Sequence, residues 1–150
     1  MLGSNTFAAM DKLNNIKGMV DMVHQANSIF ISTHKSPDGD AIGSSVGLKR
    51  ALEKLGKKIT VVVPDAFPGF LDWMVKDKPL VQFDSEPDAA KTALAEADLV
   101  FCLDYNTLSR VGKDLEEVLR SDNTPKCIID HHRQPEEVAF VAGLHDINSS

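Results

Sequence analysis

The chain has 150 residues, 43% of them hydrophobic, and a formal net charge of −6 at pH 7. This length suits one compact domain with a single core and falls short of two full domains. Acidic and basic residues are interspersed, which excludes the broad basic surface that long nucleic acid requires. A bound phosphate would therefore have to meet metal ions or a local pocket.

Composition also argues against a membrane or secreted protein. No run approaches the roughly 20 apolar residues that cross a bilayer, and the N-terminus lacks the basic-then-apolar order of a signal peptide. Cys102 and Cys127 lie inside apolar runs, where buried reduced thiols are expected rather than a disulfide or a zinc site. We therefore expect a cytoplasmic protein with no membrane partner.

The first part of the chain predicts a leader followed by a helix. Residues 1–10 show no firm periodicity and are expected to be flexible, and residues 11–150 are expected to form one domain. Apolar residues recur at helical spacing between Ile16 and Val23, which predicts a helix near residues 11–26.

Four short apolar runs then alternate with helical patterns. The runs lack the polar-apolar alternation of a half-exposed strand, which is typical of parallel strands buried on both faces. Strands alternating with helices predict an α/β fold, a parallel β-sheet flanked by helices with right-handed crossovers. The runs span residues 28–33, 58–63, 98–103 and 126–129, and the helical patterns span residues 48–55, 89–97 and 111–119.

The stretch from Pro64 to Pro87 is the least regular. It gathers several large apolar side chains, and we expect a short helix whose aromatic face packs on the edge of the sheet. A base-stacking platform is the alternative, but aromatic residues at helical spacing are usually core. The residues concerned are Phe67, Phe70, Leu71, Trp73 and Met74.

Residues with metal-binding side chains follow three of the four predicted strands, whereas Pro64-Asp65 after the second strand is a weak candidate. Ligands of an open parallel sheet bind beyond the carboxyl ends of its strands. Each group has an ordinary explanation when taken alone, because Asp and Gly favour turns and helix caps and a single histidine is usually structural. The residues are His34, Asp38 and Asp40 after the first strand, Asp104 after the third, and Asp130, His131 and His132 after the fourth.

Together these residues predict a metal centre. Four carboxylates and three imidazoles at one sheet edge would repel and desolvate one another without cations. Carboxylates with a minority of imidazoles favour manganese, magnesium or iron(II) over structural zinc, and manganese is the expected ion. So many ligands indicate two ions, about 3.5 to 4 Å apart, which suits phosphoryl displacement. Asp104 is the natural bridging carboxylate.

The segment after Asp40 offers a second feature. Its small residues, including Gly43 and Ser44, open a helix whose free backbone N–H groups could approach a phosphate. Tight packing of this helix on the sheet explains the glycines equally well.

The motif at residues 34–40, together with Asp104 and the triplet Asp130-His131-His132, resembles the DHH phosphoesterase superfamily, which is named after that triplet. Together with Arg110-Val111-Gly112, the first motif looks most similar to the group of nanoRNases, which are oligoribonucleases and pAp phosphatases. The resemblance implies a Rossmann-like DHH domain, incomplete at its C-terminus, and a separate substrate-binding domain that this chain lacks. Family members continue beyond the triplet into a short strand and an Asp-x-x-x-Ser-Ser-like segment that residues 145–150 begin.

Carried over by residue, the resemblance implies that His34 and Asp38 bind one ion, Asp40 and His131 bind the other, and Asp104 bridges them. His132 would face the phosphate and Asp130 would orient a neighbouring ligand. Phosphate contacts from Ser44 and Arg110 are weaker candidates.

The implied function is two-metal hydrolysis of phosphate esters by an activated water, with short oligonucleotides, pAp or linear or cyclic dinucleotides as substrates and a homodimer left open. An exopolyphosphatase or inorganic pyrophosphatase is one alternative. A non-catalytic metal or nucleotide-binding module, or an inactive fragment, is another.

Overall fold

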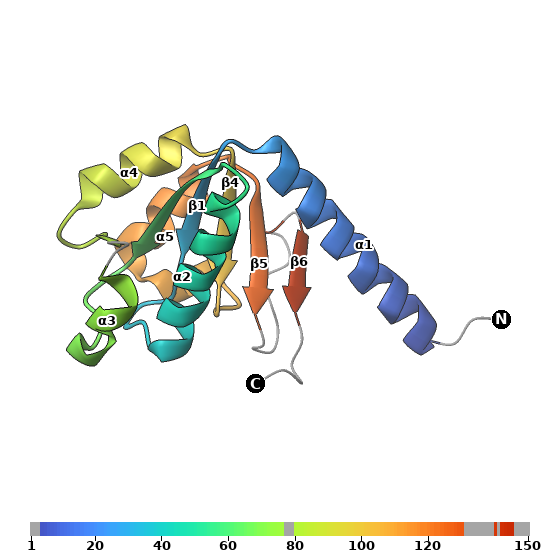
Figure 1. Cartoon of the computed structure of the whole chain (residues 1–150), viewed down its shortest axis with the longest axis horizontal. Helices are drawn as coiled ribbons and strands as arrows, with labels where there is room; N and C mark the ends of the chain where they lie inside the picture. Colours follow the sequence, from blue (N-terminus) through green and yellow to red (C-terminus); the bar gives the residue numbers. More distant parts are fainter. Residues whose placement is uncertain (1–3, 77–79, 131–139, 141, 146–150) are drawn as a thin grey trace.

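The computed structural model describes residues 4–76, 80–130, 140 and 142–145. They form a six-stranded parallel sheet flanked by helices, with strand order β3-β2-β1-β4-β5-β6 (Figure 1). The expected α/β class is thereby confirmed. The strands are β1 (Ser28–Ser32), β2 (Lys58–Val63), β3 (Val81–Gln82), β4 (Leu99–Leu103), β5 (Lys126–Asp130) and β6 (Ala142–His145).

The helices lie between the strands in the expected order. Among the described helices, none combines the length and the apolar content needed to cross a bilayer. The α-helices are α1 (Ser4–Gln25), α2 (Gly39–Glu53), α3 (Asp72–Val75), α4 (Pro87–Glu96) and α5 (Lys113–Ser121), and the 3₁₀ turns are η1 (Gly69–Leu71) and η2 (Leu108–Val111).

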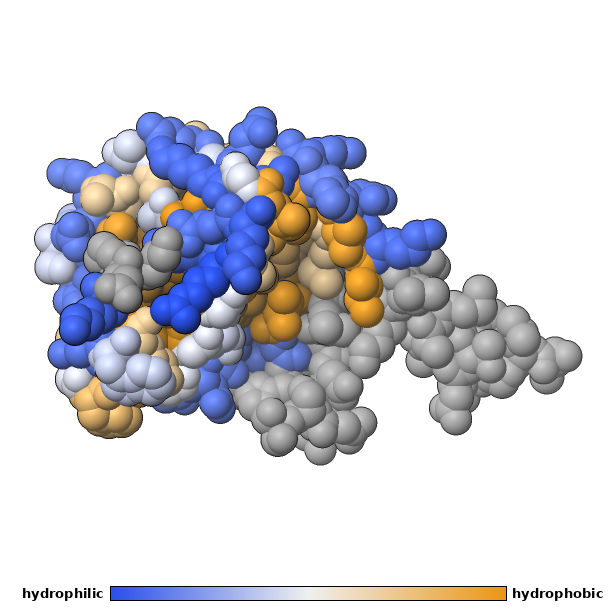
Figure 2. Space-filling view, in the orientation of Figure 1, coloured by the Kyte–Doolittle hydropathy of each residue, from blue (hydrophilic) through white to orange (hydrophobic). Residues whose placement is uncertain are grey.

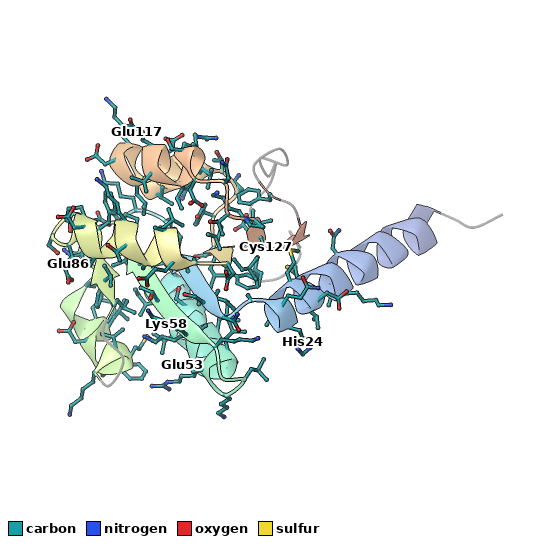
Figure 3. The ribbon with its side chains drawn as sticks, turned by 90° about the horizontal axis from the view of Figure 1, so that it is seen from above. His24, Glu53, Lys58, Glu86, Glu117 and Cys127 are labelled. Carbon is teal, nitrogen blue, oxygen red and sulfur yellow. The ribbon has the colours of Figure 1, made fainter. Side chains whose placement is uncertain are left out.

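The core has two layers because successive residues of a strand point to opposite faces of the sheet. On one face, Phe30 and Val100 pack with α4, α5 and η2. On the other face, Ile29 and Ile31 pack with α1 and α2. Seen from above, α5 and α2 lie on opposite sides of the sheet, and the N-terminal part of α1 extends beyond it (Figure 3). Burial on both faces explains why these strands are continuously apolar.

Three boundaries differ from the sequence prediction. Helix α1 begins at Ser4, within the segment predicted as a leader. Helix α2 ends at Glu53, so Leu55 lies beyond it and is 57% exposed. The helix expected over residues 111–119 is divided, because Gly112 adopts a φ of +87° between η2 and α5. This conformation is easily reached only by glycine.

Two strands had no predicted counterpart among the apolar runs. β3 has only two residues, which pair with Val62 and Val63 of β2, and such a short strand leaves no sequence pattern. β6 pairs with β5 and agrees with the short strand that the family resemblance implied after the triplet.

The segment between β2 and β3 corrects a further expectation. A short helix is present as expected, and Leu71 is buried, but Phe70 is 76% exposed and Trp73 is 71% exposed. The prediction that these two aromatic side chains pack on the sheet edge is therefore wrong. The buried side of this turn is taken by Leu71, with Phe67 and Met74 partly buried beside it.

Candidate metal centre

At the centre of the sheet, the helices that follow two neighbouring strands lie on opposite faces. β1 and β4 are neighbours, yet α2 leaves β1 toward one face and α5 follows β4 on the other. Such a divergence opens a crevice at the carboxyl ends of the strands, where open α/β sheets bind their ligands. In the register of these strands Ser32 pairs with Cys102, so residues two positions further, His34 and Asp104, come side by side.

Three of the predicted ligands converge in this crevice. Ligand atoms of His34, Asp38 and Asp104 all lie within 4.8 Å of one another. His34 Nε2 is 3.4 Å from Asp104 Oδ2 and 3.8 Å from Asp38 Oδ1. The His34 and Asp104 side chains are only 10% and 13% exposed, whereas Asp38 is 61% exposed and lies on the solvent side. One imidazole and two carboxylates form a donor set suited to a divalent cation.

The orientation of His34 supports metal binding. Its Nδ1–H donates to the Lys35 carbonyl oxygen at 2.8 Å, which leaves Nε2 turned toward the two carboxylates. A hydrogen bond from the second ring nitrogen in this way commonly fixes the orientation of metal-binding histidines. The hydrogen bond with Asp104 raises the pKa of His34, although burial acts in the opposite direction. The same carboxylates that favour a proton on His34 would favour a bound cation.

Asp38 and Asp104 are placed by different backbone devices. Asp38 is the N-cap of α2 and accepts the Ala41 N–H at 3.0 Å, so the start of the helix fixes its carboxylate. A carboxylate has further lone pairs beyond the one that caps the helix. Asp104 adopts a left-handed backbone with a φ of +63°, which Asp and Asn tolerate better than most residues. This conformation turns the chain sharply at the end of β4.

The loop that carries His34 is tied down by contacts that the sequence did not predict. Ser36, at a φ of +55°, donates its N–H to Asp65 Oδ1 at 2.7 Å, and the Lys35 N–H donates to the Arg110 carbonyl at 2.7 Å. Asp65 follows β2 and was judged a weak candidate from the sequence. Its structural role depends on the pairing of β1 with β2, which no local motif reveals.

The other predicted site residues that the structure describes lie outside the group of three. Asp40 is exposed in the first turn of α2, outside the group of three, and the Ser44 hydroxyl donates to its carbonyl oxygen. Arg110 is exposed in η2. Asp130 ends β5 and is 7% exposed, and it directly follows Ile129, which pairs with Leu103 at the end of β4. The predictions for His131 and His132 fall outside the described residues.

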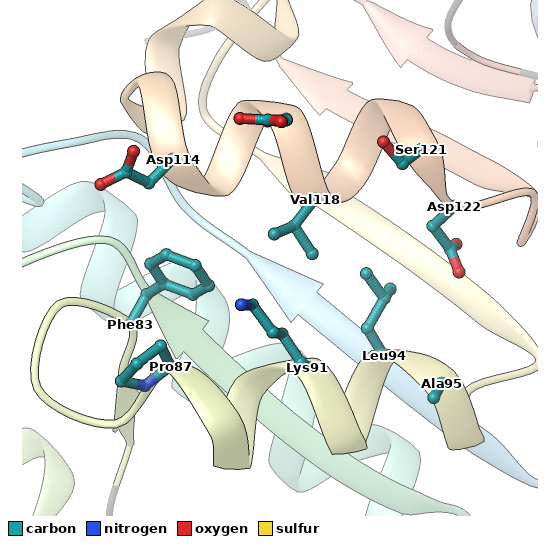
Figure 4. Close-up of a pocket in the computed structure, with 10 residues that line it drawn as sticks. Phe83, Pro87, Lys91, Leu94, Ala95, Asp114, Val118, Ser121 and Asp122 are labelled. Atoms are coloured by element: carbon teal, nitrogen blue, oxygen red, sulfur yellow. The ribbon is translucent and has the colours of Figure 1, made fainter.

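Two cavities lie on the α4 and α5 side of the sheet. One, of about 580 Å³, adjoins residues 34–40, the segment that carries His34, Asp38 and Asp40 and is called the metal loop below. It is lined by Lys35, Asp65, Gly112 and Lys113 among others. The second, of about 630 Å³, lies between α4 and α5, where the Lys91 side chain points from α4 toward α5 (Figure 4). The first cavity is therefore the one closer to the candidate metal centre, because Lys35, which lines it, directly follows His34.

Comparison with known proteins agrees with the fold. Residues 28–148 match the family model described as DHH family, N-terminal domain. A bifunctional oligoribonuclease and PAP phosphatase NrnA of Thermus thermophilus is 52% identical over 50 residues, which is 33% of this chain and 15% of that protein. The cyclic-di-AMP phosphodiesterase PdeA of Listeria monocytogenes is 27% identical over 143 residues, 85% of this chain and 21% of that protein.

A solved structure shares both fold and sequence. The crystal structure of an exopolyphosphatase-related protein from Bacteroides fragilis superimposes with a TM-score of 0.87 at 36% identity, and the match covers 92% of this chain and 40% of that chain. The matches thus cover less than half the length of each of these relatives. Because the family model covers most of the chain, from β1 to beyond β6, the chain belongs to the DHH family and corresponds to its N-terminal domain.

Proposed function

We propose that this chain carries the metal-binding half of a phosphoesterase that hydrolyses phosphate esters of short oligonucleotides, pAp, or linear or cyclic dinucleotides. The convergence of His34, Asp38 and Asp104 within 4.8 Å at the β1–β4 crevice is the observation that carries the proposal. Membership of the DHH family supports it, as do relatives described as an oligoribonuclease and PAP phosphatase and as a cyclic-di-AMP phosphodiesterase.

In this proposal the described ligands hold divalent cations, manganese before magnesium or iron(II). Bound cations would supply a water of lowered pKa as nucleophile and polarise the phosphate oxygens. Asp104 is proposed as the ligand shared by the two ions, because its Oδ2 lies 3.4 Å from His34 Nε2 and its side chain is only 13% exposed. Asp40 and His131 are proposed to complete the second ion's ligands, with Asp130 orienting a neighbouring ligand.

Other residues of this chain are proposed to handle the substrate. His132 would face the phosphate and assist the leaving group. Lys35 and Lys113 line the 580 Å³ cavity next to the metal loop, where their ammonium groups could meet a second phosphate. Arg110 in η2 and Ser44 in α2 remain further candidates for phosphate contacts.

A second enzymatic function is favoured by one observation. The Bacteroides fragilis structure is described as exopolyphosphatase-related and is 36% identical to this chain. Hydrolysis of polyphosphate or pyrophosphate would need the same metal residues and no surface for a base. A third proposal, of another class, is a metal-binding module that is inactive without further chain, since the match covers only 21% of the length of PdeA.

One experiment separates these functions. The chain is incubated with Mn²⁺ and with pApA, pAp, pyrophosphate or polyphosphate, and products are separated by chromatography while metal stoichiometry is measured on the same protein. The proposed function predicts cleavage of the nucleotides that is lost in Asp104→Asn and kept in Asp21→Asn, an exposed carboxylate on α1. Preferential release of phosphate from polyphosphate would favour the second function. Bound Mn²⁺ without any cleavage would favour the third.

A further inference from the structure

The short segment between β2 and β3 presents two large aromatic side chains to solvent. Phe70 is 76% exposed and Trp73 is 71% exposed. They are three residues apart across η1 and α3, a spacing that places side chains on the same side of a helical turn. Figure 2 shows apolar surface at the lower left, over the segment that carries α3 in Figure 1.

This segment is anchored rather than loosely attached. Leu71, between the two aromatic residues, is 3% exposed and packs with Ile42, Val46 and Val63. Its N–H donates to the Pro68 carbonyl at 3.0 Å, which closes the turn. Because Leu71 is fixed in the core on one side of this turn, Phe70 and Trp73 are held on the other side, in solvent.

The anchor also places the aromatic pair beside the candidate metal centre. A methyl group added at Gly39 would lie 3.9 Å from Leu71 Cδ2, and Gly39 is the residue between Asp38 and Asp40. In Figure 1, α3 lies at the start of α2, at the end of the sheet toward which the strand arrows point. The segment that carries the aromatic pair thus packs, through Leu71, against the residue between Asp38 and Asp40.

We propose that Phe70 and Trp73 form a stacking platform for a nucleobase of the substrate, so that this segment selects nucleotides over inorganic polyphosphates. The inference rests on the proposed function and specifies its substrate class. Aromatic faces stack on any base without reading its sequence, which suits an enzyme for short nucleotides of mixed sequence. The location next to the metal loop favours a substrate group over a protein partner.

Intrinsic fluorescence provides a direct test because Trp73 is the single tryptophan of the chain. The chain is titrated with AMP in the presence of Mn²⁺, and with ribose 5-phosphate and inorganic phosphate as ligands that lack the base. We expect saturable quenching by AMP and none by the two base-free ligands. Phe70→Ala should weaken AMP binding about 5- to 100-fold, the range expected for loss of one base–aromatic stack.

Calorimetry with variants supplies the second measurement and the control. Trp73→Ala should weaken AMP binding to the same extent as Phe70→Ala and leave the affinity for ribose 5-phosphate unchanged. Leu55→Ala removes another exposed apolar side chain, 57% exposed beyond the end of α2, and should change neither affinity. Equal quenching by ribose 5-phosphate, or AMP affinities unaffected by both aromatic substitutions, would overturn the platform.

The same samples distinguish failure of the platform from failure of the proposed function. If the chain binds Mn²⁺ and phosphate and cleaves pApA, but substitution of Phe70 or Trp73 leaves its affinity for AMP unchanged, only the platform is wrong. If neither phosphate binding nor ester cleavage depends on Mn²⁺, the proposed function fails and the platform fails with it. In a longer protein that contains this sequence, Trp73 emission that is already shifted to the blue and insensitive to AMP would indicate another protein surface as the occupant and overturn the platform.

Discussion

Replacement of Asp104 by asparagine provides the sharpest test of the metal centre. Asp104 is 13% exposed, its Oδ2 is 3.4 Å from His34 Nε2, and its φ is +63°. Asparagine tolerates this left-handed backbone as well as aspartate does, so the substitution removes the charge without adding strain. The expected change is in metal binding rather than in the fold.

The magnitude follows from binding linkage. A ligand at 100 times its Kd stabilises the folded state by about 2.7 kcal/mol. Loss even of a group that only orients a metal ligand typically weakens metal binding about 10- to 100-fold, so loss of Asp104 itself should weaken it at least 100-fold. At the same Mn²⁺ concentration, bound metal would then stabilise the folded variant by only about 0.4 kcal/mol. The difference of about 2.3 kcal/mol corresponds to about 5 to 9 °C in Tm for a domain of this size.

The assay is thermal unfolding of each protein with and without Mn²⁺, so that any effect on the metal-free fold cancels within each variant. Asp21→Asn, on α1 and away from the carboxyl ends of the strands, is the matched control and should gain as much from Mn²⁺ as the original chain. An Asp104→Asn protein that gains the same Tm shift as the original would refute the assignment of Asp104 as a ligand.

Three further predictions address the surroundings of the site and the core. Asp65→Ala should lower Mn²⁺ affinity about 10- to 100-fold by calorimetry, because the Ser36 N–H loses the acceptor that holds the metal loop. Asp65→Asn, which keeps an acceptor oxygen, should retain most of the affinity. Backbone N–H donors lower the pKa of Asp98 below 3.8, so its charge stabilises the fold above pH 3.8 and this stabilisation is lost as the pH falls through the lowered value. In urea unfolding, the difference in free energy of unfolding between the original chain and Asp98→Asn should shrink as the pH falls through that range. Burial raises the pKa of Cys102 to about 12 and of Cys127 to about 11, so DTNB should label neither thiol until the chain unfolds.

Each of these predictions has a contrary outcome. Equal Mn²⁺ affinity in the two Asp65 variants would show that the anchor does not position the ligands. An advantage of Asp98 over asparagine that stays constant as the solution is acidified would contradict its lowered pKa. Complete thiol labelling on mixing with the native protein would contradict burial of both cysteines.

The sequence determined the fold class and most of its strands because these depend on local patterns. Continuous apolar runs produced β1, β2, β4 and β5 within one or two residues of their expected bounds. Metal-type residues directly after β1 and β4 marked the ligand candidates. The topology was required to show that those two strands are neighbours, which is what brings His34 and Asp104 together.

Features that depend on contacts between distant segments were decided only by the tertiary structure. Asp65 holds the metal loop because β2 lies beside β1, and the two-residue strand β3 exists only through its pairing with β2. The aromatic segment shows the same limit. Its composition predicted burial, but of the described residues there Leu71 is buried, Phe67 and Met74 are partly buried, and Phe70 and Trp73 are left in solvent. The type of a side chain indicates how much its burial would stabilise the fold. Which side chain is buried depends on the packing partners that the tertiary structure brings to that point.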